Sequence, residues 1–152
     1  MMRIERDDLS RPEVAALVAY HLREMHAHSP ACQVFALDSS GLSHPDVTVW
    51  TVWDGADLLG MGAMKRLDDG HGELKSMRTA PSALRRGVAR AVLDHMIGEG
   101  RARGYRRLSL ETGCTAPFEP AHALYRAAGF VETGPFADYS DMSFSRYFTL
   151  AL

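Results

Sequence analysis

A run of arginines and small residues near the middle of the chain offers the clearest ligand chemistry. The segment Arg85-Arg86-Gly87-Val88-Ala89-Arg90 is expected to open a long helix after a strand. Unpaired backbone amides and the positive dipole end make a helix start suitable for phosphate groups. Gly87 and Ala89 are small enough for a pyrophosphate to approach the backbone, and the arginines add positive charge. This spacing alone leaves two readings open: a phosphate-binding turn, or a helix with exposed arginines.

Two common nucleotide-binding motifs do not fit this turn. It lacks the Gly-Lys-Ser/Thr ending of a Walker A loop, and it lacks the GxGxxG spacing of dinucleotide-binding domains. Any phosphate ligand must therefore be held in another way.

Bulk properties narrow the class of protein further. The chain has 152 residues, 46% of them hydrophobic, which predicts one globular domain over residues 1–152. A net charge of −2 disfavours nucleic acid as a partner. The first eight residues do not resemble a signal peptide, and no apolar run approaches the ~20 residues that span a bilayer. Cys32 and Cys114 do not suggest a disulfide framework, so we expect a cytoplasmic protein with no membrane partner.

The order of predicted elements is typical of a mixed α/β domain. Apolar residues at three- and four-residue spacing predict a helix over Pro12–His28, and β-branched and aromatic residues predict a strand over Val47–Trp53. Similar reasoning gives strands near 3–5, 58–67, 73–78, 107–112, 130–133 and 144–152, and helices from 80–82 to about 103 and over 120–128. We expect a single α/β domain with a mixed, mostly antiparallel sheet of about seven strands flanked by helices. The buried stripe expected for the long central helix comprises Leu84, Val88, Ala91, Val92 and Met96.

Three stretches together resemble the GNAT (GCN5-related N-acetyltransferase) superfamily. They are Glu73-Leu74-Lys75-Ser76-Met77-Arg78-Thr79, the Arg-Arg-Gly-Val-Ala turn, and the segment 121–130, whose sequence AHALYRAAGF fits the family's A-x-x-L-Y-x-x-x-G-F pattern. The resemblance implies an N-acetyltransferase that moves the acetyl group of acetyl-CoA directly to an amine, with no metal. The acceptor, a small molecule or a protein, is not readable. A homodimer is common in the family, and the hairpin that carries Trp50 and Trp53 is a candidate contributor.

The resemblance also implies how acetyl-CoA binds. The fourth and fifth strands should splay, so that the fourth pairs with the pantetheine arm and the helix-opening turn cradles the pyrophosphate. Leu84 stands where the family has Gln or Arg, and Phe118 where it often has Asn, so the cradle should rest on backbone amides. The expected cofactor-binding residues are Met77, Arg78, Thr79, Arg85, Arg86, Gly87, Val88, Ala89, Arg90 and Thr112.

Acetylation of an amine needs a base and benefits from an acid. Deprotonating an amine of pKa near 10.4 at pH 7 costs roughly 4–5 kcal/mol. The resemblance places Tyr125 beside the sulfur as the candidate acid, with core packing as the alternative. Glu73 and Glu111 are candidate bases because each lies in a strand bordering the gap, and Glu111 is preferred. An ordinary surface carboxylate, or an ion-pair partner for Lys75 or Arg78, is the open alternative for each.

Acceptor specificity should reside in His26–Leu42 and in Ala137-Asp138-Tyr139, the regions least like the family. Asp138 is either a partner for a cationic amine or an ordinary turn residue. His26 and His28 point apart on a helix, so a metal site there is not expected. The rival to an enzyme is a non-catalytic acyl-CoA-binding module or an interaction protein that reuses the fold.

Overall fold

A computed structural model of the chain describes residues 1–30, 34–140 and 143–152, so Cys32 and part of His26–Leu42 lie outside the described residues. Within these ranges, every helix is too short or too polar to cross a bilayer. Short 3-10 turns lie at Pro81–Ala83 and Ala116–Phe118. The other elements are β1 (Arg3–Arg6), α1 (Pro12–His28), α2 (Ser39–Leu42), β2 (Val47–Asp54), β3 (Asp57–Asp68), β4 (His71–Thr79), α3 (Val88–Ala102), β5 (Arg107–Gly113), α4 (Glu119–Ala127), β6 (Val131–Thr133) and β7 (Ser145–Ala151).

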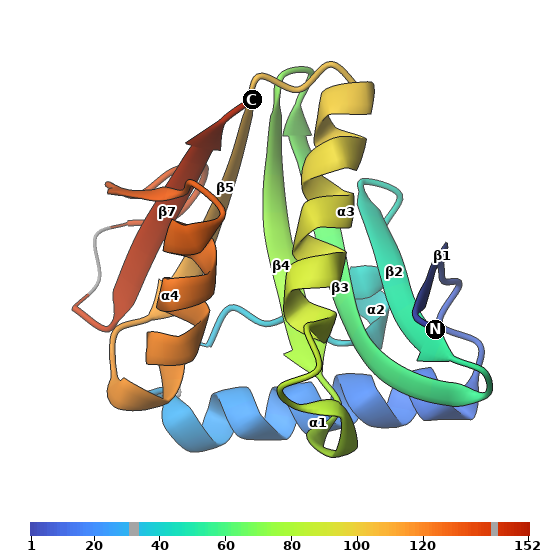
Figure 1. The fold of residues 1–152 in the computed structure, drawn as a ribbon. Coiled ribbons are helices and arrows are strands. Elements are labelled where there is room, and N and C mark those ends of the chain that lie inside the picture. Colours follow the sequence, from blue (N-terminus) through green and yellow to red (C-terminus); the bar gives the residue numbers. More distant parts are fainter. Residues whose placement is uncertain (31–33, 141–142) are drawn as a thin grey trace.

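The strands form one seven-stranded sheet in the order β1-β2-β3-β4-β5-β7-β6. Every neighbouring pair is antiparallel except β4 and β5, which run parallel. Their pairing begins at His71 and Arg107 and stops at Leu74 and Leu110, although both strands continue. Figure 1 shows the two strands diverging beyond that point. The expected fold, including the splayed fourth and fifth strands, is therefore confirmed.

A bulge in β4 lies where the strands separate. Met61 of β3 pairs with Arg78 and Ala63 pairs with Lys75, so β4 carries one extra residue in this interval. Within it, Ser76 has a φ of 54°, in the left-handed region that β-strands avoid. A bulge bends its strand and increases its twist. This local insertion accompanies the departure of β4 from β5.

The helices cover the two faces of the sheet with separate cores. On one face, α3 and α4 lie in front of the sheet in Figure 1, and Leu93 and Met96 of α3 are fully buried there. On the other face, Leu17 of α1 packs with α2 and the central strands. Trp50 and Trp53 are each only 2% exposed, so both pack the sheet and neither ring is available to a second copy.

The start of the central helix differs from the expectation. The residues from Pro81 form a separate 3-10 turn, and α3 begins only at Val88. Between them, Arg85 and Gly87 have φ angles of 64° and 78°. Left-handed residues cannot continue a right-handed helix. Leu84 is consequently off the helix and 61% exposed, so its predicted place in the buried stripe is wrong.

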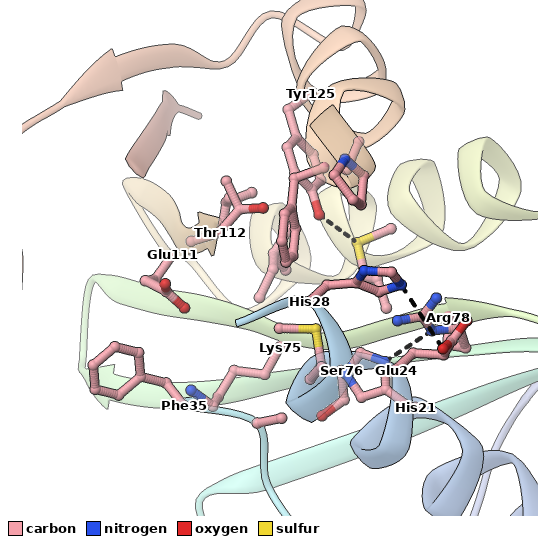
Figure 2. Close-up of a pocket in the computed structure, with 18 of the residues that line it drawn as sticks. His21, Glu24, His28, Phe35, Lys75, Ser76, Arg78, Glu111, Thr112 and Tyr125 are labelled. Carbon is pink, nitrogen blue, oxygen red and sulfur yellow. Dashed lines mark hydrogen bonds and ion pairs between the residues drawn. The ribbon is translucent and has the colours of Figure 1, made fainter. Parts of the chain in front are cut away.

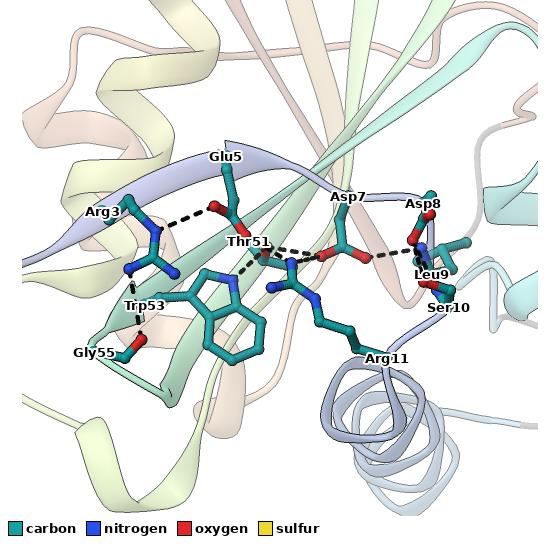
Figure 3. Close-up of polar contacts among 10 residues, drawn as sticks. All are labelled: Arg3, Glu5, Asp7, Asp8, Leu9, Ser10, Arg11, Thr51, Trp53 and Gly55. Atoms are coloured by element: carbon teal, nitrogen blue, oxygen red, sulfur yellow. Dashed lines mark hydrogen bonds and ion pairs between the residues drawn. The ribbon is translucent and has the colours of Figure 1, made fainter.

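A buried carboxylate fixes the start of α1 against the sheet (Figure 3). The Asp7 side chain has no exposed surface, accepts hydrogen bonds from the Leu9 amide at 2.8 Å and the Thr51 hydroxyl at 3.0 Å, and pairs with Arg11 at 2.5 Å. The Arg11 guanidinium also lies 4.1 Å from the centre of the Trp53 ring. These contacts join the segment before α1 to β2, and so determine where α1 lies over the sheet.

Candidate active site

Two cavities meet where β4 and β5 separate. The first, about 300 Å³, lies among α1, β4, β5 and the start of α4, and Figure 2 shows its lining side chains. The second, about 580 Å³, lies between the start of α3 and α4. Five residues line both cavities: Met77, Arg78, Pro117, Ala121 and Tyr125. Molecules bound in the two cavities would therefore face one another across a shared wall.

The second cavity contains the helix start singled out from the sequence. Gly87 is the N-cap residue of α3 and has no side-chain cap, so the first-turn amides keep their hydrogen-bonding capacity. A Cβ added at Gly87 would meet no atom within 4 Å, which shows open space over the turn. Thr79, Leu84 and Val88 contribute further to the lining. The site thus offers unpaired donors beside an accessible apolar surface.

The three arginines of this turn are placed differently. Arg85 and Arg90 line the second cavity, and Arg90 also pairs with Asp94 at 2.9 Å. Arg86 instead pairs with Asp54 at 3.3 Å and lines another groove. Two of the three arginine side chains therefore add positive charge to the cavity itself.

An unpaired strand edge connects the two cavities. Beyond Leu74, β4 continues to Thr79 with no β5 partner on that side among the described residues. A free strand edge can bind an extended ligand as an additional strand. Met77 and Arg78 belong to this edge, while Thr112 of β5 is buried and lines the first cavity.

Tyr125 lies in the wall shared by the two cavities. Its ring is buried, and its hydroxyl has one described contact, to the Met77 sulfur at 3.9 Å (Figure 2). Burial, together with the nearby charge of Glu111, raises the pKa of Tyr125 to about 12. The phenol therefore keeps its proton at neutral pH, and only a weak sulfur acceptor competes for it.

Glu73 is held in a buried polar group. The Tyr139 hydroxyl donates to its carboxylate at 2.5 Å, and the Lys75 ammonium pairs with the same oxygen at 3.2 Å. Lys75 also donates to the Tyr139 oxygen at 3.0 Å. Glu73 is only 3% exposed. This geometry matches the alternative of an ion-pair partner for Lys75 that the sequence left open.

Glu111 lines the same cavity in a different environment. Its carboxylate accepts a hydrogen bond from the Ser145 hydroxyl at 2.8 Å and has no ion pair with any described residue. Burial raises the pKa of Glu111, an effect that Lys75 partly offsets. A carboxylate with a raised pKa is a stronger base while it stays ionised near neutral pH.

The last turns of α1 supply a wall that sequence reasoning missed. His21, Glu24, Met25 and His28 line the first cavity, and their spacing of three, four and seven residues places them on one helical face. That periodicity was the signal available in the sequence. The described residues include no group of three or more His, Cys, Asp or Glu able to hold a metal ion.

The two regions expected to set specificity reach the site unequally. Phe35 and Ala36, from the segment after α1, line the first cavity together with His28. In the later segment, Asp138 is exposed and does not line the cavity, while Tyr139 reaches β4 through Glu73.

Arg78 reaches from β4 to α1. Its Nε donates to Nδ1 of His21 at 3.0 Å, and its guanidinium carbon lies 5.6 Å from the centre of the Tyr20 ring. Burial and the charge of Arg78 lower the pKa of His21 to about 3, so the imidazole is neutral and accepts this bond. The sequence identified Arg78 for its backbone, whereas the structure also gives its side chain a place in the cavity wall.

Comparison with known proteins identifies the family. Residues 9–130 match the model of the acetyltransferase (GNAT) family. An uncharacterized N-acetyltransferase of Escherichia coli K12, YedL, is 51% identical over 152 residues, which is all of this chain and 96% of the relative. Its Bacillus subtilis counterpart, YsnE, is 49% identical over 151 residues, covering 99% of this chain and all of the relative.

A solved structure supports the fold. A GNAT acetyltransferase from Elizabethkingia anophelis with acetyl-CoA bound superposes with a TM-score of 0.71 at 14% identity, covering 99% of this chain and 98% of that one. Together with the matched family model and the two full-length relatives, this places the chain in the GNAT acetyltransferase family.

Proposed function

We propose that the protein is an acetyl-CoA-dependent N-acetyltransferase that transfers the acetyl group directly to an amine. The observation that carries this proposal is the shared wall of the two cavities, where Tyr125 lies between a free strand edge and Glu111. The acetyl-CoA bound to a structural neighbour of the same family supports the assignment of the co-substrate.

The residues of the second cavity fit acetyl-CoA. The uncapped amides at the start of α3 would hold the pyrophosphate, with open space over Gly87 and positive charge from Arg85 and Arg90. The backbone of Met77–Thr79 would pair with the pantetheine arm as an added strand. The bound thioester supplies an activated acyl group.

Two side chains then manage the protons. Glu111 accepts the proton of the incoming amine, directly or through a water, so that the nitrogen can form its bond to the acyl carbon. As the carbon–sulfur bond breaks, Tyr125 donates its phenolic proton to the sulfur. Once Glu111 is protonated, the negative charge that raises the pKa of Tyr125 is gone, so the phenol becomes a better acid when it is needed.

The test is steady-state CoA release from acetyl-CoA with a panel of amines, with the acetylated product identified by mass. Turnover of one or more amines is expected. Tight acetyl-CoA binding without turnover of any amine would instead support a non-catalytic acyl-CoA-binding module. A lack of acetyl-CoA binding would support an interaction protein on the same fold.

A further inference from the structure

Arg78 brings a positive charge into the acceptor cavity without a matching carboxylate. Apart from the Nε bond to His21, its guanidinium has no hydrogen-bond acceptor or ion pair among the described residues. Burial lowers the pKa of Arg78, with only partial compensation from Glu24 and two tyrosines. A partly buried charge is expensive unless it is paired. The cavity therefore has the electrostatics of a site for an anion.

The surroundings of Arg78 hold its planar group in place. The neutral His21 ring accepts from Nε, and the Tyr20 ring flanks the guanidinium, so the Nη groups are the donors left for a ligand. An arginine with a fixed plane binds a carboxylate through two parallel hydrogen bonds. A positioned fork of this kind favours a planar anion.

The opposite end of the cavity suits a cation or an amine. Figure 2 shows Glu111 and Arg78 on opposite sides of the cavity, with the Tyr125 hydroxyl lying between them. Glu111 has no ion pair with a described residue, whereas Glu73 is already paired with Lys75. A cavity of about 300 Å³ admits a small molecule.

We infer that the acceptor is an amino acid, whose carboxylate binds Arg78 while its amine faces Glu111; this rests on the proposed acetyltransferase function. A carboxylate is favoured over a phosphate because Glu24, Glu73 and Glu111 also border the cavity, and a dianion would be repelled more strongly than a monoanion. The acceptor thus carries two opposite charges that match the two ends of the site.

The test compares amino acids with the amines left after loss of the carboxylate, for example phenylalanine with phenethylamine and leucine with isopentylamine. In the wild type, we expect kcat/KM to favour the amino acid of a pair by about 30-fold, equivalent to about 2 kcal/mol. Arg78→Gln should abolish this preference by raising KM for the amino acid, while KM for acetyl-CoA and for the plain amine stays within about twofold. Arg78→Lys, which keeps the charge but not the fork, should give an intermediate preference.

The matched control is Arg126→Gln, because Arg126 is an exposed arginine that pairs with Glu132 away from both cavities. Equal activity on both members of every pair, or a preference that Arg78→Gln leaves intact, would overturn this inference and leave the acetyltransferase function standing. Preference for a phosphorylated amine would overturn it as well. CoA release with no amine at all would instead contradict the proposed function, and this inference with it.

Discussion

Replacing Tyr125 by Phe removes the proposed acid and little else. The hydroxyl loses only its 3.9 Å contact to the Met77 sulfur. The ring keeps its place beside Phe130 and Phe148, whose centroids each lie 6.0 Å from it. We therefore expect the free energy of unfolding to change by less than about 1 kcal/mol.

The effect on catalysis should be much larger than the effect on stability. Loss of a positioned general acid costs typically about 10²- to 10⁴-fold in rate. Because thiolate departure can proceed without full protonation, we expect the lower part of this range, a fall in kcat of about 100- to 1000-fold, or about 3–4 kcal/mol of activation free energy. KM for acetyl-CoA should change little, since the cradle at the start of α3 is untouched.

The assay is CoA release at saturating acetyl-CoA and acceptor, followed over pH. The pKa of Tyr125 is about 12, so in the wild type the acid stays protonated and should produce no alkaline decline in kcat below about pH 11. A Tyr125→Phe enzyme with a kcat within about threefold of the wild type would refute the assignment of Tyr125 as the acid. A marked loss of thermal stability would show instead that the hydroxyl is structural.

Three further predictions concern the base, the cradle and the fold. Glu111→Gln should lower kcat by about 100-fold or more; because the pKa of Glu111 is raised in the folded state, its ionised form opposes folding above the unfolded pKa, so the same variant should melt at a higher temperature at pH 8. Gly87→Ala, at a φ of 78°, should cost about 1–2 kcal/mol and weaken acetyl-CoA binding by calorimetry, whereas Gly98→Ala inside α3 should stabilise by about 1 kcal/mol without altering that affinity. In urea denaturation, Asp7→Ala should lose about 2–4 kcal/mol by stranding the donors around a buried carboxylate, against less than about 0.5 kcal/mol for Asp69→Ala at an exposed ion pair.

The elements were predictable because their signals are local. Alternating β-branched and aromatic residues specify β2, and apolar residues at helical spacing specify α1. The start of α3 was not, because Leu84 fits the helical period and no residue type forces Arg85 into the left-handed region. Periodicity records which residues could share a face, while the backbone angles of the turn decide whether they do.

The cofactor half of the candidate site was readable and the acceptor half was not. Backbone cradles have short contiguous patterns, such as the segment 85–90. The contact between Arg78 and His21 joins residues 57 positions apart, and no single-sequence pattern reports it. Likewise, Tyr139 reaches Glu73 across 66 positions. Long-range contacts of this kind decide which titratable groups are paired, and pairing determines their chemical roles.

The environments of Glu73 and Glu111 divide two similar carboxylates into different roles. Glu73 already receives hydrogen bonds from Lys75 and Tyr139, so protonating it would break an ion pair. Glu111 has only a serine donor, and burial favours its protonated form, so accepting a proton relieves a cost that the fold otherwise bears. The same event removes the charge that holds the proton on Tyr125. Proton uptake from the amine and proton release to the sulfur are therefore electrostatically coupled, and Glu73→Gln should disturb this coupling far less than Glu111→Gln.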